Sequence, residues 1–81
     1  MMSNLEKEEI LEATIAGMPR VAEAIAAVPI EHRARALDAA EQSYLQTLQD
    51  LGYAEAATRK WVSAVMFQLL EKMEEELSVA T

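Results

Sequence analysis

Hydrophobic residues recur every three to four positions along most of this chain, and Gly or Pro interrupts the pattern at only a few points. That spacing places apolar side chains on one face of an α-helix, and the alternation typical of β-strands is missing. We expect an all-α fold, a single helical domain over residues 1–81 that forms a small bundle of three to four helices. The interruptions place these helices at approximately 4–17, 19–28, 29–51 and 54–79.

Short sequence signals define the expected helix ends. Ser3 followed by Glu6 forms a capping box, which satisfies unpaired N–H groups at the start of the first helix. Pro19 and Pro29 each stand where a helix begins, because proline has a helical φ angle and its missing N–H would have no helical partner there. Gly52 follows the third helix, at the position where a left-handed residue commonly closes a helix.

The third and fourth helices have the clearest apolar faces. At 100° per residue, one side of the third helix gathers Ile30, Leu37, Tyr44, Leu48 and Leu51. An apolar arc on the fourth helix contains Trp61, Val62, Val65, Met66, Leu69, Leu70, Met73 and Leu77. The second helix offers mainly alanines, which permit close approach but bury little surface. We therefore expect a long antiparallel hairpin of the third and fourth helices to form the core.

The fourth helix is long for a chain of this size. At ~1.5 Å per residue it spans about 39 Å. A globule of 81 residues has a radius of gyration of about 12 Å and a diameter near 30 Å. We expect one end of this helix to project or to find a partner, which makes its length a sign of assembly.

Phe67 lies outside the apolar arc of the fourth helix, among Lys60, Ser63, Glu71 and Glu74. It is exposed if the helix packs through one face, and buried if one of the first two helices covers that side. Exposed aromatic residues near Met and Leu are typical anchors of helix–helix contacts. We expect a second copy, in a homodimer, or another protein to bind there. The candidate interface comprises Phe67, Trp61, Met66, Leu70, Met73 and Leu77.

Glu41 is a charged residue at the inward stripe of the third helix, about 40° around the helix from Leu37. A buried carboxylate there has to be paired with a cation or kept in its protonated form. Arg20, Arg59 and Lys60 are the available cations. We expect an ion pair that fixes the helix register, with a binding or acid–base carboxylate as the alternative.

The charge balance opposes generic binding to phosphate backbones. Seven Lys and Arg residues face fourteen Asp and Glu residues, which gives a net charge of −7. The function we expect is a small acidic interaction or oligomerisation module. One alternative is an acidic nucleic-acid mimic that inhibits a nucleic-acid-binding protein. Another is weak nucleic-acid binding through Arg33, Arg35, Arg59 and Lys60.

Catalytic and metal-binding patterns are absent from the sequence. The single histidine, His32, sits on a polar helix face, and no second His or Glu-x-x-His spacing accompanies it. It also lacks the orienting group needed to activate Ser43 or Ser63. We expect no enzyme activity and no cofactor. Without cysteine, signal-peptide pattern or membrane-length apolar run, a cytoplasmic protein without a membrane partner is expected.

The corner Leu51-Gly52-Tyr53, followed by Ala57, Trp61 and Val62, is similar to the Leu-Gly-Tyr corner of ubiquitin-associated-type three-helix domains. The C-terminal domain of Holliday-junction-binding helicase cofactors has a comparable corner. The resemblance is confined to this corner, and the helix that follows is far longer here. It adds no expected binding residue.

Overall fold

The computed structural model describes residues 3–79, and no strand occurs among them. Its helices are α1 (Asn4–Ala16), α2 (Met18–Ala26), α3 (Ile30–Asp50) and α4 (Glu55–Val79). The all-α fold expected from the sequence is confirmed. The helix ends lie within two residues of the predicted ones, which is the usual uncertainty of such boundaries.

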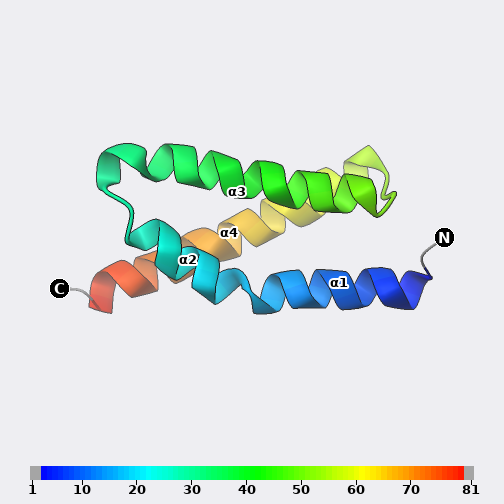
Figure 1. Ribbon diagram of the computed structural model, residues 1–81, viewed down its shortest axis with the longest axis horizontal. Coiled ribbons are helices and arrows are strands. Elements are labelled where there is room, and N and C mark those ends of the chain that lie inside the picture. The colour runs from blue at the N-terminus through cyan, green and yellow to red at the C-terminus, as the bar shows by residue number, and fades with distance from the viewer. Residues whose placement is uncertain (1–2, 80–81) are drawn as a thin grey trace.

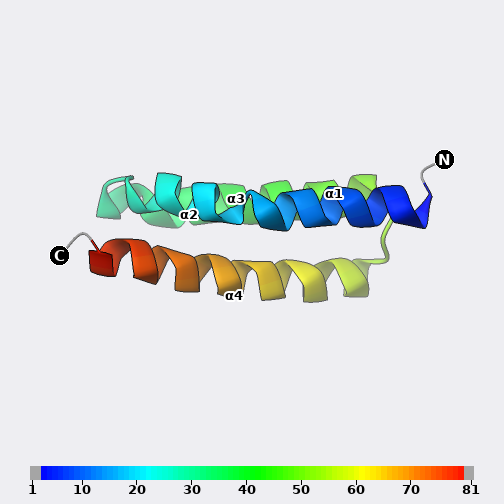
Figure 2. The same cartoon turned by 90° about the horizontal axis from the view of Figure 1, so that it is seen from below.

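The helices form two layers, and the hairpin of α3 and α4 connects one layer to the other. Figure 2 shows α1, α2 and α3 together in one layer and α4 alone in the other. In Figure 1, α4 crosses behind this first layer at a slant, so that it begins near the end of α3 and finishes near α2. Each half of α4 therefore packs against a different helix.

Helices α1 and α2 are two arms of one bent helix that meet at Gly17 (Figure 1). Ser3 caps α1, because its side chain accepts a hydrogen bond of 3.1 Å from the Glu6 N–H. At the bend, Gly17 donates to the Ala13 carbonyl, but Pro19 has no N–H to continue the ladder. The missing bond and the proline ring explain the kink.

Hydrogen bonds to the last carbonyls of a helix stabilise both the connection between α2 and α3 and the connection between α3 and α4. The Arg33 side chain reaches back and donates to the carbonyls of Val28 and Ala26 at 3.0 and 3.1 Å. After α3, Gly52 adopts a left-handed φ of 85°. The N–H groups of Gly52 and Tyr53 then donate to the carbonyls of Gln49 and Leu48, which makes a Schellman motif.

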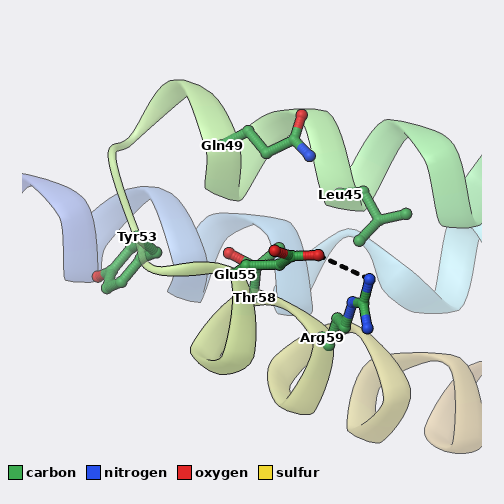
Figure 3. A pocket seen from close by; sticks show the side chains of 6 residues that line it. All are labelled: Leu45, Gln49, Tyr53, Glu55, Thr58 and Arg59. Carbon is green, nitrogen blue, oxygen red and sulfur yellow. Dashed lines mark hydrogen bonds and ion pairs between the residues drawn. The ribbon is translucent and has the colours of Figure 1, made fainter.

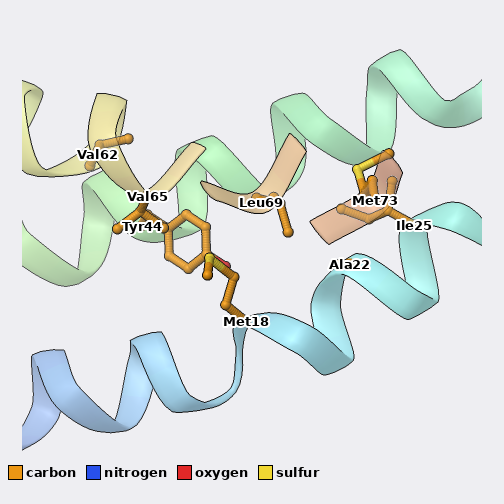
Figure 4. Close-up of a cluster of buried hydrophobic side chains, with 8 residues drawn as sticks. All are labelled: Met18, Ala22, Ile25, Tyr44, Val62, Val65, Leu69 and Met73. Carbon is orange, nitrogen blue, oxygen red and sulfur yellow. The ribbon is translucent and has the colours of Figure 1, made fainter. Parts of the chain in front are cut away.

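The core lies where α2, α3 and α4 meet (Figure 4). Its main cluster consists of Met18, Ala22, Ile25, Tyr44, Val62, Val65, Leu69 and Met73. Helix α2 contributes more than its alanine-rich sequence predicts, because its contact with α4 is the most extensive in the bundle. Ala22 is completely buried, so its small side chain lets α2 approach α4 closely.

The molecule is elongated, with extents of 46 × 20 × 16 Å and a radius of gyration of 13.7 Å. That radius exceeds the value of about 12 Å for a compact globule of this length. At ~1.5 Å per residue α4 is about 37 Å long, so it fits within the long axis. The expectation that α4 outgrows its own bundle is therefore wrong, and its length alone does not indicate assembly.

Candidate functional site

Phe67 is the largest exposed side chain of α4, with 65% of its surface accessible. It lies about 160° around the helix from Leu69, which is completely buried. Because α4 is alone in its layer, neither α1 nor α2 covers this side (Figure 2). The outer position expected for Phe67 is found, and the alternative in which the N-terminal helices bury it is not.

The other interface candidates divide between the surface and the core. Leu70, one turn from Phe67, is 45% exposed. Trp61, Met66 and Leu77 are half-buried, and the Trp61 ring packs edge-on against Tyr44 with 6.2 Å between ring centres. Met73 is only 5% exposed and belongs to the core. Met73 was therefore wrongly assigned to the candidate interface.

Charged side chains surround Phe67 on the outer face of α4, which we define as Lys60, Ser63, Phe67, Leu70, Glu71 and Glu74. All six are exposed. The ion pairs found on α4 join Arg59 to Glu55 at 2.6 Å and Lys72 to Glu75 at 3.5 Å. Within residues 3–79, Lys60, Glu71 and Glu74 form none. The outer face therefore presents an apolar centre between unpaired charges.

Glu41 is exposed, so the expectation of a buried carboxylate is wrong. It lies at the rim of a shallow cleft of about 260 Å³ together with Leu45, Arg59 and Val62. Arg59 pairs with Glu55 instead. Glu41 lies on the α3 side of this cleft and Arg59 and Val62 lie on the α4 side, so its side chain is at the edge of the contact between the two helices and not inside it. Ile30, at the start of the inward stripe of α3, is 75% exposed.

The corner between α3 and α4 holds a second shallow pocket of about 320 Å³ (Figure 3). It is lined by Leu45, Gln49, Tyr53, Glu55, Thr58 and Arg59. The ion pair between Glu55 and Arg59 crosses it, as the dashed line shows. The only carboxylate and the only cation of this lining are therefore paired with each other.

Two buried hydroxyls that no sequence pattern indicated belong to Tyr44, in the core, and to Thr58, in the lining of the corner pocket. The Tyr44 phenol and the Thr58 hydroxyl have no hydrogen-bond partner in the part of the chain that the structure describes. Burial raises the pKa of Tyr44 above its ordinary value of about 10, because desolvation disfavours the phenolate. Neither oxygen is accessible to solvent, so neither is placed to contact a ligand.

The four cations considered for nucleic-acid binding do not form one free patch. Arg33 is used to close the end of α2, and Arg59 is paired with Glu55. Arg35 and Lys60 are exposed but lie on different helices. The capping role of Arg33 was not predicted from the sequence, because the carbonyls it binds come within reach of its side chain only when the chain turns at Pro29.

Residues 3–79 contain no group of three or more side chains able to hold a metal ion. In the same range, no helix has the length and apolar character needed to cross a membrane. On α4, the large apolar side chains that are exposed are Phe67 and Leu70, both on its outer face. No protein-family model, curated protein or solved structure shows significant similarity to the chain.

Proposed function

We propose that this chain is a non-enzymatic helical interaction module that forms homodimers through the outer face of α4. The observation that carries the proposal is the exposure of Phe67, with Leu70 beside it, on a helix whose opposite side fills the core. An aromatic side chain next to an aliphatic one on an exposed helix face is the kind of anchor that helix–helix contacts use.

The expected affinity is modest. Burying a side chain the size of Phe67 contributes roughly 1.5 to 3 kcal/mol, which changes a dissociation constant about ten- to a hundredfold. A contact made through one face of one helix is small beside the roughly 1,200–2,000 Å² of a typical stable interface. We therefore expect a dimer that forms at micromolar concentration and exchanges readily with monomer.

The test is the mass in solution, measured by light scattering over a concentration series. Phe67→Glu should shift the protein to monomer and leave its helicity nearly unchanged, because position 67 lies outside the core. Leu69→Glu is the matched control on the same helix. It should unfold the chain, because it places an unpaired charge at a position with no exposed surface.

Three results would overturn the proposal. One is a wild-type protein that stays monomeric at every concentration. Another is a Phe67→Glu variant that dimerises like wild type with its helices intact, since the contact would then lie elsewhere. The third is a Phe67→Glu variant that melts as Leu69→Glu does, because Phe67 would then be a core residue and the outer face would lose its anchor.

A further inference from the structure

The outer face of α4 has the spacing of a helix–helix seam. Lys60, Ser63, Phe67, Leu70 and Glu74 follow one another at intervals of three, four, three and four residues. This is the spacing that keeps side chains along one line when two helices pack side by side. Phe67 is the midpoint, because Lys60 and Glu74 each lie seven residues from it.

The two outer charges of this seam have no opposite charge within one turn on their own helix. Side chains on a helix meet at separations of three or four residues. Around Lys60 these positions are Ala56, Ala57, Ser63 and Ala64, and around Glu74 they include no Lys or Arg. Neither Lys60 nor Glu74 forms an ion pair within residues 3–79. Both therefore remain available to a second molecule.

From this pattern we infer that the second copy binds with its α4 antiparallel to the first and with the two-fold axis passing beside Phe67. This inference rests on the proposed function and specifies its geometry. A two-fold axis at position 67 places each residue opposite the one equally far from Phe67 on the other side. Lys60 of each copy then faces the partner's Glu74, which makes two ion pairs around a Phe67–Phe67 contact.

The same arrangement matches side chains of different size. Leu70 lies three residues after Phe67 and Ala64 three residues before it, so each Leu70 faces the partner's Ala64. Both positions are exposed in the single chain. A small side chain opposite a large one allows the two helices to approach closely without overlap.

Two other arrangements of the two helices oppose like charges or lose the ion pairs. A parallel pair in register would bring Lys60 against Lys60 and Glu74 against Glu74, which is unfavourable. An antiparallel pair centred between Phe67 and Leu70 would set Lys60 against the partner's Leu77 and leave Glu74 beside the partner's Ser63. Charge therefore favours the register centred on Phe67 over these two, and this register also brings the two Phe67 side chains together.

The experiment uses two charge reversals, Lys60→Glu and Glu74→Lys, alone and mixed. Each variant alone should dimerise about five- to fiftyfold more weakly than wild type, because both ion pairs become repulsive contacts. An equal mixture should recover the wild-type dimer constant within about threefold, because in the mixed dimer each altered residue faces its opposite charge. The double variant, which carries both reversals in one chain, should dimerise as well as wild type.

The matched control removes the effect of net charge. Arg35→Glu and Glu23→Lys change the net charge of the chain by the same amounts, at exposed positions on α3 and α2 away from the outer face. These two variants should dimerise like wild type, and mixing them should change nothing. Circular dichroism of every variant checks that the helices are retained.

Failure of this register is distinguishable from failure of self-association. If the wild type is a dimer but mixing restores nothing, the antiparallel register is wrong and self-association stands. If the wild type never dimerises, both proposals fail.

A second measurement tests the register without altering charge at Lys60 or Glu74. The chain has no cysteine, so Ser63→Cys and Glu71→Cys each introduce a unique thiol. These positions lie four residues on either side of Phe67 and face each other across the proposed axis. A short bismaleimide should link Ser63→Cys chains to Glu71→Cys chains in preference to joining like chains. Preferential linking of like chains would overturn the antiparallel register.

Discussion

Tyr44 and Thr58 bring hydroxyl groups into a core that offers them no hydrogen-bond partner among residues 3–79. An unpaired buried hydroxyl costs the folded state about 1–3 kcal/mol relative to one that is bonded. The aromatic ring of Tyr44 offsets part of this through its edge-on contact with Trp61. The aromatic ring of Tyr44 therefore stabilises this part of the core, and its hydroxyl group does not.

Tyr44→Phe should therefore leave the free energy of unfolding at neutral pH unchanged or raise it by up to about 1 kcal/mol. The two proteins should diverge at alkaline pH. Since burial raises the pKa of Tyr44 in the folded state, the unfolded chain loses this proton first as pH rises. Wild type should then lose stability above about pH 10, and this part of the loss should be missing in Tyr44→Phe.

Urea unfolding of both proteins from neutral to alkaline pH measures this difference. Only the difference between the two curves is assigned to Tyr44, because other groups titrate in the same range. A marked loss of stability in Tyr44→Phe at neutral pH would show that the phenol is hydrogen-bonded.

Single residues differ in how far the sequence predicts their place. The outer position of Phe67 follows from helix periodicity, which depends only on its own helix. The exposure of Glu41 depends on the direction in which α4 crosses α3, and no local pattern encodes that direction. Helix periodicity places Glu41 near Leu37, but α4 passes at the edge of this position, where Glu41 shares a shallow cleft with Arg59 and Val62.

Among the features of the helices, the sequence predicts their ends best, because capping and turn residues act on backbone groups only a few positions away. The Ser3 cap and the Gly52 turn are both found. The role of α2 was not predicted, because it depends on how closely the surface of α2 fits against α4 and not on the apolar area of its own side chains. Ala22 buries little surface of its own, but it allows Met18 and Ile25 to reach the core.

The two glycines should respond oppositely to alanine. Gly52→Ala should lower the free energy of unfolding by roughly 1–2 kcal/mol, because an L-residue is strained at its left-handed φ of 85°. Gly17 has helical dihedrals, and an added Cβ would meet only the Ala13 and Thr14 carbonyls, at 3.6 and 3.7 Å. Gly17→Ala should raise stability by about 0.5–1 kcal/mol.

Thermal or urea unfolding of the two single variants measures both effects. Equal destabilisation by both substitutions would contradict this account. It would mean that the bend between α1 and α2 requires a glycine at position 17, although the φ and ψ angles of Gly17 are ones that alanine can adopt.

At the scale of the whole molecule, packing is uneven along the bundle. Leu48 and Leu69 are the largest fully buried side chains and lie on facing helices, whereas α1 has no buried residue. At the other end of the chain, Glu74, Glu75 and Glu76 place negative charge at the negative pole of the α4 dipole. The centre of the hairpin should therefore be the last part to open.

Hydrogen exchange should reveal this order in the monomer. Amides of α1 and those from about Glu74 onward should exchange first, and those around Leu48 and Leu69 last. Near its N-terminal end, α1 contacts the corner between α3 and α4, where the Lys7 ammonium lies 5.5 Å from the centre of the Tyr53 ring. If α1 amides were protected as well as those of α3, this contact and the Ser3 cap would hold α1 more firmly than its packing indicates.

The elongated shape also governs how the protein rotates in solution. Most of its helices run close to the 46 Å axis, so their N–H bonds point along that axis (Figure 1). Spinning about the long axis leaves these bonds almost unmoved, and only the slower end-over-end tumbling reorients them. Nitrogen-15 relaxation of the helices will therefore give a longer correlation time than a sphere of equal mass. Gel filtration will overstate the mass of a single chain for a related reason, because a rod has the hydrodynamic radius of a larger sphere.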